Sequence, residues 1–268
     1  MPALPTSAPS PQGGTVSRRE LVAGSGSFAI GFAIGSFLAR AGLAPVVSSA
    51  QEPAVPPWPW PYHPLDPEAV ARRAYEGYWK GACNYGAAEA IIGELARTVG
   101  HPYTLLPVDM FRYGEGGVVG WATLCGALNG AAAAICLVTP KAAYSALIHE
   151  LMGWYTTVAF PLYRPAGGVE LPTSVSGSPL CHVSVTRWCE ASGYAEDSRE
   201  RKERCARLTA DVARQAVVLL NDYHEGRFVA RYVAPASIQA CMSCHGPGGL
   251  NHTRGKMDCA QCHTPHDT

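Results

Sequence analysis

Apolar residues recur at helical spacing along most of the chain, and no convincing run of alternating, strand-like residues interrupts them. The first helix is expected at Asp66-Pro67-Glu68, where an N-cap acid precedes a proline at the first helical position and an acid in the first turn. This helix should run to about Lys80. A second helix should run from about Ala82 to Gly100.

The segment Trp121–Val138 is rich in alanine and glycine, which predicts a buried helix in close contact with its neighbours. A membrane-spanning helix is the alternative, but Thr123, Asn129 and the short length argue against it. Thr139-Pro140 should start the next helix, which is expected to reach about Phe160.

The last two helices of the body are predicted to begin at Ser178-Pro179 and after Asp197-Ser198. The second of these is charged and should end near His224, with apolar residues at helical spacing at Leu208, Val212, Ala216 and Leu219. We therefore expect an all-α, helical bundle-like body over residues 67–232. Residues 233–268 are poor in large apolar residues, which predicts a short, irregular tail organised by its cofactors.

The N-terminal residues 1–50 resemble a twin-arginine export signal. Arg18 and Arg19 precede a glycine-containing apolar stretch, and small residues lead to an exit at Ala50. An uncleaved membrane anchor is the alternative, because the apolar stretch is just long enough to span a bilayer. The protein should therefore be periplasmic or otherwise extracytoplasmic, with membrane contact only through an uncleaved signal.

Residues 51–66 form a proline-rich arm that cannot be a helix or a central strand. Trp58, Trp60 and Tyr62 should pack on the body or on a partner subunit, since exposed aromatic residues at this density are unfavourable.

The formal net charge is zero, so no nucleic acid partner is indicated. The ten cysteines are more informative. Four of them lie in Cys241-Met-Ser-Cys244-His245 and Cys259-Ala-Gln-Cys262-His263. This C-x-x-C-H pattern is typical of a c-type haem, in which both thiols bond covalently to the haem and the histidine is the proximal iron ligand. We therefore expect two haems c, with His245 and His263 as proximal ligands.

A zinc ribbon is the main alternative, because the spacing of the four motif cysteines resembles a four-cysteine zinc site. Disulfides within each motif are another. The histidine after each pair, the export signal and the additional histidines of the tail favour haem.

The sequence does not identify the distal haem ligands. The candidates are His252, His266 and His224, followed by Met242 and Met257. His266 lies only three residues after His263, so it should serve the other haem or a haem of a second subunit. So short a tail cannot bury two haems alone. We therefore expect the haems to stack, to dock on the body or to be covered in a homodimer.

The remaining cysteines can meet only across helices. Cys125 and Cys136 are about 16 Å apart along one predicted helix, so they cannot share a site. A common site must draw one cysteine from each of several helices, and a set that satisfies this condition is Cys83, Cys125, Cys181 and Cys205.

The sequence around these four cysteines is similar to that of a known protein family. The segments that contain them are Gly81-Ala-Cys83-Asn-Tyr-Gly86, Cys125-Gly-Ala-Leu-Asn-Gly130, Gly177-Ser-Pro-Leu-Cys181 and Arg204-Cys205. These segments resemble a family of redox-active helical proteins named for its spaced cysteines. With the C-terminal di-haem tail, the chain resembles the split-Soret cytochromes c. The first motif departs from the pattern at Asn84-Tyr85, where Cys-Ala is commoner. The resemblance implies an exported electron-transfer dimer with closely stacked haems and, in the helical part, an iron–sulfur centre.

The export signal supports the iron–sulfur centre independently. Haem is attached after export, whereas a cofactor inserted in the cytoplasm requires export of a folded protein. The hypothesis is that Cys83, Cys125, Cys181 and Cys205, or three of them, hold the cluster. Buried thiols and disulfides are the alternatives.

The expected function is electron transfer by a di-haem c-type cytochrome, with redox partner proteins that the sequence does not identify. A haem-dependent small-molecule reductase and a redox sensor are the alternatives. The chain contains no nucleophile elbow, phosphate-binding loop or paired-carboxylate signature, which favours a carrier over an enzyme.

Overall fold

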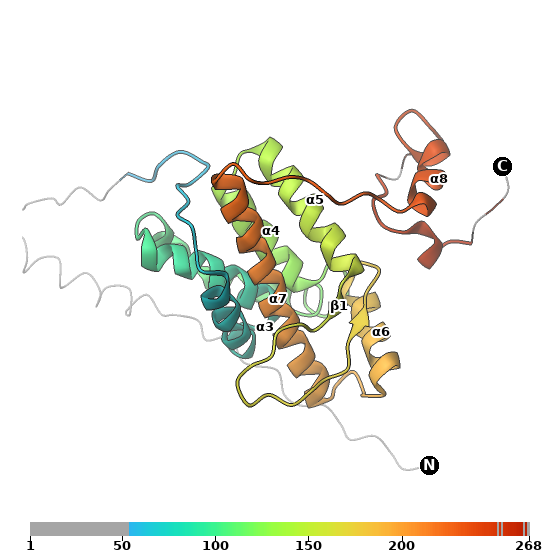
Figure 1. Cartoon of the computed structure of the whole chain (residues 1–268), viewed down its shortest axis with the longest axis horizontal. Coiled ribbons are helices and arrows are strands. Elements are labelled where there is room, and N and C mark those ends of the chain that lie inside the picture. Colours follow the sequence, from blue (N-terminus) through green and yellow to red (C-terminus); the bar gives the residue numbers. More distant parts are fainter. Residues whose placement is uncertain (1–53, 251, 253, 265, 267–268) are drawn as a thin grey trace, which may run out of the picture. The chain divides into compact units, whose positions relative to one another are not determined.

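The computed structural model describes residues 54–250, 252, 254–264 and 266, so the expected export signal lies outside the described residues. The described part is mostly helical, in agreement with the all-α prediction. The helices of the body are α3 (Pro67–Thr98), α4 (Gly126–Val138), α5 (Lys141–Thr157), α6 (Cys181–Ser192) and α7 (Arg199–His224) (Figure 1).

The core lies where α3, α4 and α7 pack together, and small residues allow their backbones to approach closely. Ala87, Ala131 and Ala213 are fully buried there. A Cβ atom at Gly130 of α4 would overlap the backbone carbonyl of Asn84 on α3. The alanine- and glycine-rich segment is therefore a buried helix with close contacts, as predicted. None of the described helices is long and apolar enough to cross a membrane.

Helix α3 is kinked where the sequence predicts a break between two helices. Its first turn is capped by Asp66, whose side chain accepts a hydrogen bond from the Glu68 N–H at 2.9 Å. Gly81 and Ala82 have non-helical backbone angles, and the helix resumes at Cys83. The kink thus sets the direction of the first cysteine of the proposed cluster.

Helix α4 begins at Gly126 and not at Trp121, which corrects the prediction. A distant segment holds the preceding residues outside the helix. Cys181 and His182 donate backbone hydrogen bonds to the carbonyls of Thr123 and Ala122, at 2.7 and 3.1 Å. These contacts satisfy backbone groups that a longer helix would have used.

Helix α5 ends at Thr157, short of the predicted Phe160. The residues after it form a small antiparallel ladder, in which β1 (Ala159–Phe160) pairs with β2 (Ser174–Val175). This ladder is a minor departure from the all-α prediction. It lies before α6, whose first residue is Cys181 (Figure 1).

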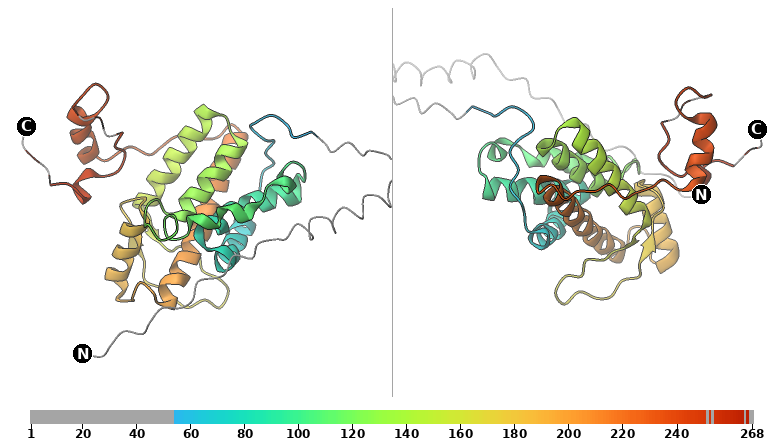
Figure 2. Two further views of the ribbon diagram at one scale, coloured as in Figure 1. Left: turned by 180° about the vertical axis from the view of Figure 1, so that it is seen from behind. Right: turned by 45° about the horizontal axis from the view of Figure 1, so that its top comes forward.

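The tail is more regular than predicted. An extended segment, residues 227–235, leads from α7 to the helix α8 (Ala236–His245), which contains the whole first C-x-x-C-H motif (Figure 2). The second motif begins in the 3-10 turn η3 (Cys259–Gln261). Helical geometry places the motif cysteines Cys241 and Cys244 about one turn apart, on one side of α8.

The aromatic residues of the arm pack on the body, as predicted. The Trp58 indole N–H donates to the Cys136 carbonyl at 2.7 Å, and the Tyr62 hydroxyl donates to Asn221 Oδ1 at 2.7 Å. Trp60 packs edge-on against Tyr103, with ring centroids 5.3 Å apart.

Candidate functional site

The structure brings together the four cysteines that were predicted to share a site. Cys83 begins the second segment of α3, Cys125 is the N-cap of α4, Cys181 is the first residue of α6, and Cys205 lies in the second turn of α7. Each of these thiols is close enough to others of the set to influence their ionisation electrostatically. We call this set the cysteine cluster.

Backbone N–H groups lie near two of these sulfurs and oppose the effect of burial on their pKa. Near Cys125 they are those of Ala127 and Leu128, which have no partner inside the first turn of α4. Near Cys83 it is that of Gly116, in the glycine-rich turn before α4. Such donors favour negatively charged sulfur.

Burial opposes that charge when the thiols are free. It is the largest cause that raises the pKa of Cys83 and of Cys125, and it raises the pKa of Cys181 to about 12. Neighbouring thiols of the cluster raise each pKa further. In the metal-free protein these thiols are therefore neutral at pH 7, and a bound metal would have to displace their protons.

The thiols of the cysteine cluster are free. All ten cysteines lie within the described residues, and none of them is paired in a disulfide. Within the described ranges, no three His, Cys, Asp or Glu side chains are arranged to hold a single metal ion, in the cluster or in the tail. A metal–sulfide cluster spaces its thiolates more widely than a single ion, because inorganic sulfide lies between the metal and its neighbours.

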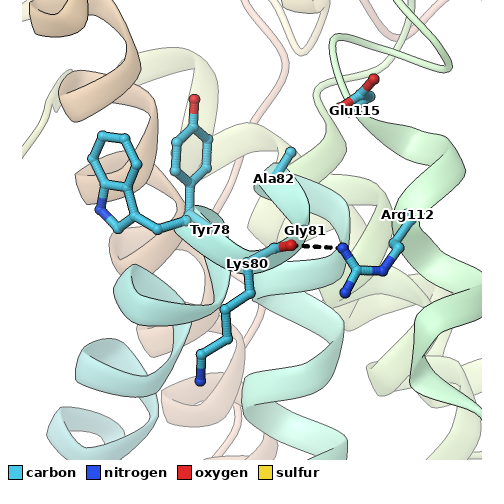
Figure 3. Close-up of a pocket in the computed structure, with 7 residues that line it drawn as sticks. Tyr78, Lys80, Gly81, Ala82, Arg112 and Glu115 are labelled. Atoms are coloured by element: carbon cyan, nitrogen blue, oxygen red, sulfur yellow. Dashed lines mark hydrogen bonds between the residues drawn. The ribbon is translucent and has the colours of Figure 1, made fainter.

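A pocket of about 300 Å³ lies over the kink of α3, directly before Cys83 (Figure 3). Its lining includes Tyr78, Ala82 and Arg112. The guanidinium of Arg112 points at the kink and donates a hydrogen bond to the Lys80 carbonyl at 2.6 Å. Tyr78 is close to Cys205 and Cys83, and burial raises its pKa. The pocket therefore adjoins the cysteine cluster.

In the tail, the first haem motif has a histidine that is already oriented. Nδ1 of His245 lies 3.0 Å from the Leu250 carbonyl oxygen, so the other ring nitrogen is free for a metal. Burial and the neighbouring Cys241 raise the pKa of Cys259, so the first cysteines of the two motifs lie close together. The two motifs therefore lie side by side. Cys244 and Cys262 are exposed.

The distal candidates differ in their surroundings. His266 lies beside His245, with ring centroids 6.0 Å apart and ring planes at 90°. His224, by contrast, is stacked on Tyr62 at 4.4 Å in the body. Burial lowers the pKa of His224, and the nearby Val138 backbone opposes that shift. His252 is exposed in the tail.

Comparison with known proteins places this arrangement in a family. Residues 85–219 match the family model described as "Putative redox-active protein (C_GCAxxG_C_C)". The chain is 38% identical, over 264 residues, to the split-Soret cytochrome c of Desulfovibrio desulfuricans, covering 93% of this chain and 95% of that protein. This chain belongs to the split-Soret cytochrome c family. A solved structure of the Desulfovibrio desulfuricans ATCC 27774 protein, reported for a novel iron centre, matches with 38% identity and a TM-score of 0.72. The match covers 77% of this chain and 91% of that one.

Within this split-Soret fold, the cluster is surrounded by polar residues that were not predicted from the sequence. Arg204 and Ser184 are buried, and a hydrogen bond of 2.9 Å joins them. The signal for Arg204 was present, because it lies four residues before Leu208 and so carries a charge onto the apolar stripe of α7. Such a charge needs a buried partner.

Proposed function

We propose that this split-Soret family member is an extracytoplasmic electron-transfer protein with two haems c in its tail and an iron–sulfur centre at the cysteine cluster. The observation that carries the proposal is the convergence of four cysteines from four separate segments around the buried cation Arg204, in a chain that also carries two C-x-x-C-H motifs. Both kinds of centre exchange single electrons.

The geometry of His245 supports haem attachment at the first motif. A histidine that binds iron through one ring nitrogen commonly donates its other N–H to a backbone carbonyl, which fixes the ring. His245 has that relationship with Leu250. Cys241 and Cys244, one turn before it on α8, would then supply the thioether bonds, and Cys259, Cys262 and His263 would do the same for the second haem.

His266 is the best-placed distal ligand for the first haem. Two imidazoles on opposite sides of one iron, each bonded at roughly 2 Å, have ring centroids on the order of 6 Å apart. The His245 and His266 rings have that separation. The sequence argument, which assigns His266 to the haem of the other motif or to a haem of a second subunit, allows this role. His252 then remains in the tail for the second haem, whereas the stacking of His224 on Tyr62 argues against a role for that residue.

The residues of the cysteine cluster fit an iron–sulfur centre by their chemistry. Cysteine thiolates are the usual ligands of such centres. Arg204 is 1% exposed and would offset part of the negative charge that four thiolates carry. Its Nε atom is buried and has no hydrogen-bond partner among the described residues. The related protein with a reported iron centre supports the assignment.

The homodimer remains part of the proposal. The tail has few apolar side chains to cover two haems. A second cavity, of about 350 Å³, is lined by Ile148 and Met152 of α5 and by Met257 of the tail, and it offers an apolar surface on the body. A second subunit would cover the haem surface that the body leaves open. Export by the twin-arginine route is consistent with a body that holds a cofactor before it leaves the cytoplasm.

One preparation tests the function. The full chain, matured with haem-attachment machinery and purified without oxygen, should contain two haems and additional non-haem iron with matching acid-labile sulfide. Both haems should be low-spin by EPR. Iron equal to the haem content would exclude the iron–sulfur centre. A high-spin, five-coordinate haem would favour the reductase alternative, and a monomeric mass at micromolar concentration would exclude the homodimer.

A further inference from the structure

The buried guanidinium of Arg204 lies at the cysteine cluster without a carboxylate partner. Its side chain is 1% exposed, and no acidic side chain of the described residues lies within ion-pair distance of it. Asp211 on the same helix interacts with it at longer range, but both carboxylate oxygens of Asp211 accept backbone N–H groups, from Leu162 and Tyr163. Burying a charge without a close counter-charge costs several kcal/mol.

The guanidinium instead faces sulfur and a hydroxyl. Nη1 donates to the sulfur of Cys205 at 3.8 Å, and Nη2 donates to Ser184 Oγ at 2.9 Å. Burial alone would lower the pKa of Arg204, but the nearby sulfurs of Cys205 and Cys125 and the Tyr155 hydroxyl raise it above its ordinary value. The sulfurs of the cluster would therefore match the charge of Arg204 once they carry negative charge themselves.

A chain of hydroxyl groups carries this influence to a second cysteine. Ser184 and Tyr155, both buried, are hydrogen-bonded at 2.9 Å. The Tyr155 hydroxyl lies near Cys125, where it opposes the rise that burial causes in the pKa of that thiol. The chain thus runs from Arg204 on α7 through Ser184 on α6 and Tyr155 on α5 to the N-cap of α4.

The direction of the hydrogen bonds can respond to the charge on the sulfurs. Arginine can only donate, whereas each hydroxyl can donate once and accept. With neutral thiols, Tyr155 donates to Ser184, which accepts two bonds. With negatively charged sulfur, rotation of the two hydroxyls lets Ser184 donate to Tyr155 and Tyr155 donate to Cys125. No proton enters or leaves the site in this change.

We propose that Arg204 is the counter-charge of the iron–sulfur centre, acting directly on Cys205 and through Ser184 and Tyr155 on Cys125. The proposal rests on the proposed function, because it assigns positioning residues to that centre. One electron from a haem or another one-electron donor would reduce one iron of the centre from ferric to ferrous, and the centre with its sulfur ligands would become more negative by one charge. The guanidinium and the Tyr155 hydroxyl stabilise that charge, so together they raise the reduction potential of the centre.

The chain supplies a matched control one turn further along α7. Arg207 is 2% exposed, about as buried as Arg204, but its guanidinium forms an ion pair with Glu203 at 2.7 Å. Its charge is already compensated by a carboxylate. Removing Arg207 should therefore lower stability without changing the potential of the centre.

The experiment is an EPR-monitored redox titration of the full-length holoprotein, with the haem midpoints as internal reference and with iron and sulfide counted in each variant. Arg204→Met should disfavour reduction of the centre about tenfold, which lowers its midpoint by about 60 mV. Tyr155→Phe should lower the equilibrium constant for reduction of the centre about threefold, and so lower its midpoint by less than Arg204→Met does. Arg204→Lys should restore most of the potential, and Arg207→Met should leave it at the wild-type value.

Loaded Arg204→Met protein with a wild-type midpoint would overturn the proposal, as would an equal shift in Arg207→Met. If Arg204→Met does not hold the centre, Tyr155→Phe decides, and a wild-type midpoint in that variant would overturn the proposal. Haem iron alone in the wild-type protein is a separate result. It would overturn the iron–sulfur centre itself, before any variant is compared.

Discussion

The imidazole rings of His245 and His266 lie at right angles, with their centroids 6.0 Å apart, although the two residues belong to opposite ends of the tail. Nδ1 of His245 is engaged with the Leu250 carbonyl, which leaves its other nitrogen for a metal. In the proposed function, this relationship would give the first haem a histidine on each side and would distinguish it from the second haem.

Replacing His266 should therefore change one haem and not the other. His266→Ala should convert the first haem from low-spin to high-spin, because the iron loses its distal imidazole while His245 remains. EPR and the optical spectrum of the oxidised protein measure this change. His252→Ala should affect the second haem, and His101→Ala, outside the tail, should affect neither. A fully low-spin spectrum in His266→Ala would exclude this residue as a ligand.

The cysteine cluster predicts selective loss of non-haem iron. Cys125→Ser should abolish or severely reduce the iron and sulfide that exceed the haem content, because a serine hydroxyl is a poorer iron ligand than a thiolate. Both haems should remain attached. Cys136→Ser is the matched control, since Cys136 lies on the same helix, about 16 Å from Cys125 along the axis. Equal iron loss in both variants would contradict the assignment.

The predictable parts of the fold are those with a local chemical cause. Pro67 after an N-cap acid, and Ser198 before a long amphipathic segment, mark helix starts that the structure confirms. The start of α4 was not predictable, because Thr123 is held by a backbone hydrogen bond from Cys181, far away in the sequence. Helix α8 was missed because the tail has too few apolar residues to give a helical pattern.

The same distinction applies to the site. Helical geometry alone showed that a shared site needs one cysteine from each of several helices, and the structure brings the predicted four close together. Which other side chains lie next to these cysteines depends on tertiary packing. No sequence motif marks Ser184 or Tyr155, and only the packing of α5, α6 and α7 joins them to Arg204 in one hydrogen-bonded chain.

Backbone strain at the kink of α3 predicts a stabilising substitution. Ala82 has φ 61° and ψ −169°, a region essentially restricted to glycine, where other residues cost on the order of 1–3 kcal/mol. Ala82→Gly should raise the free energy of unfolding by about 1 kcal/mol, after the greater entropy of glycine in the unfolded chain is included. Urea unfolding followed by circular dichroism measures the change.

Ala87, fully buried in the second segment of the same helix, provides the opposite control. Ala87→Gly should lower stability by about 1 kcal/mol or more, because glycine is a poor residue inside a helix. If Ala82→Gly lowers stability as much as Ala87→Gly does, the Ala82 methyl group contributes more than the strain costs.

Asp211 predicts how stability changes with pH. Its side chain is 4% exposed, and burial raises its pKa to about 7, although two backbone N–H groups at 2.8 and 2.7 Å oppose the shift. In the unfolded chain the same carboxyl has a pKa of about 3.9. Between these values the folded state binds the proton and the unfolded state does not. Stability should therefore fall as the pH rises from about 4 to about 7, by up to a few kcal/mol.

Asp211→Asn should remove this part of the pH dependence, because asparagine does not titrate. Its amide can accept only one of the two N–H groups and turns a donor toward the other, which costs about 1–3 kcal/mol. The variant should therefore be clearly less stable than wild type at pH 5 and closer to it at pH 8. Urea midpoints across this range measure the difference, with Asp222→Asn, at a more exposed position on the same helix, as the control. A constant difference between Asp211→Asn and wild type would mean that Asp211 is charged throughout this range, and its two backbone hydrogen bonds would then outweigh its burial.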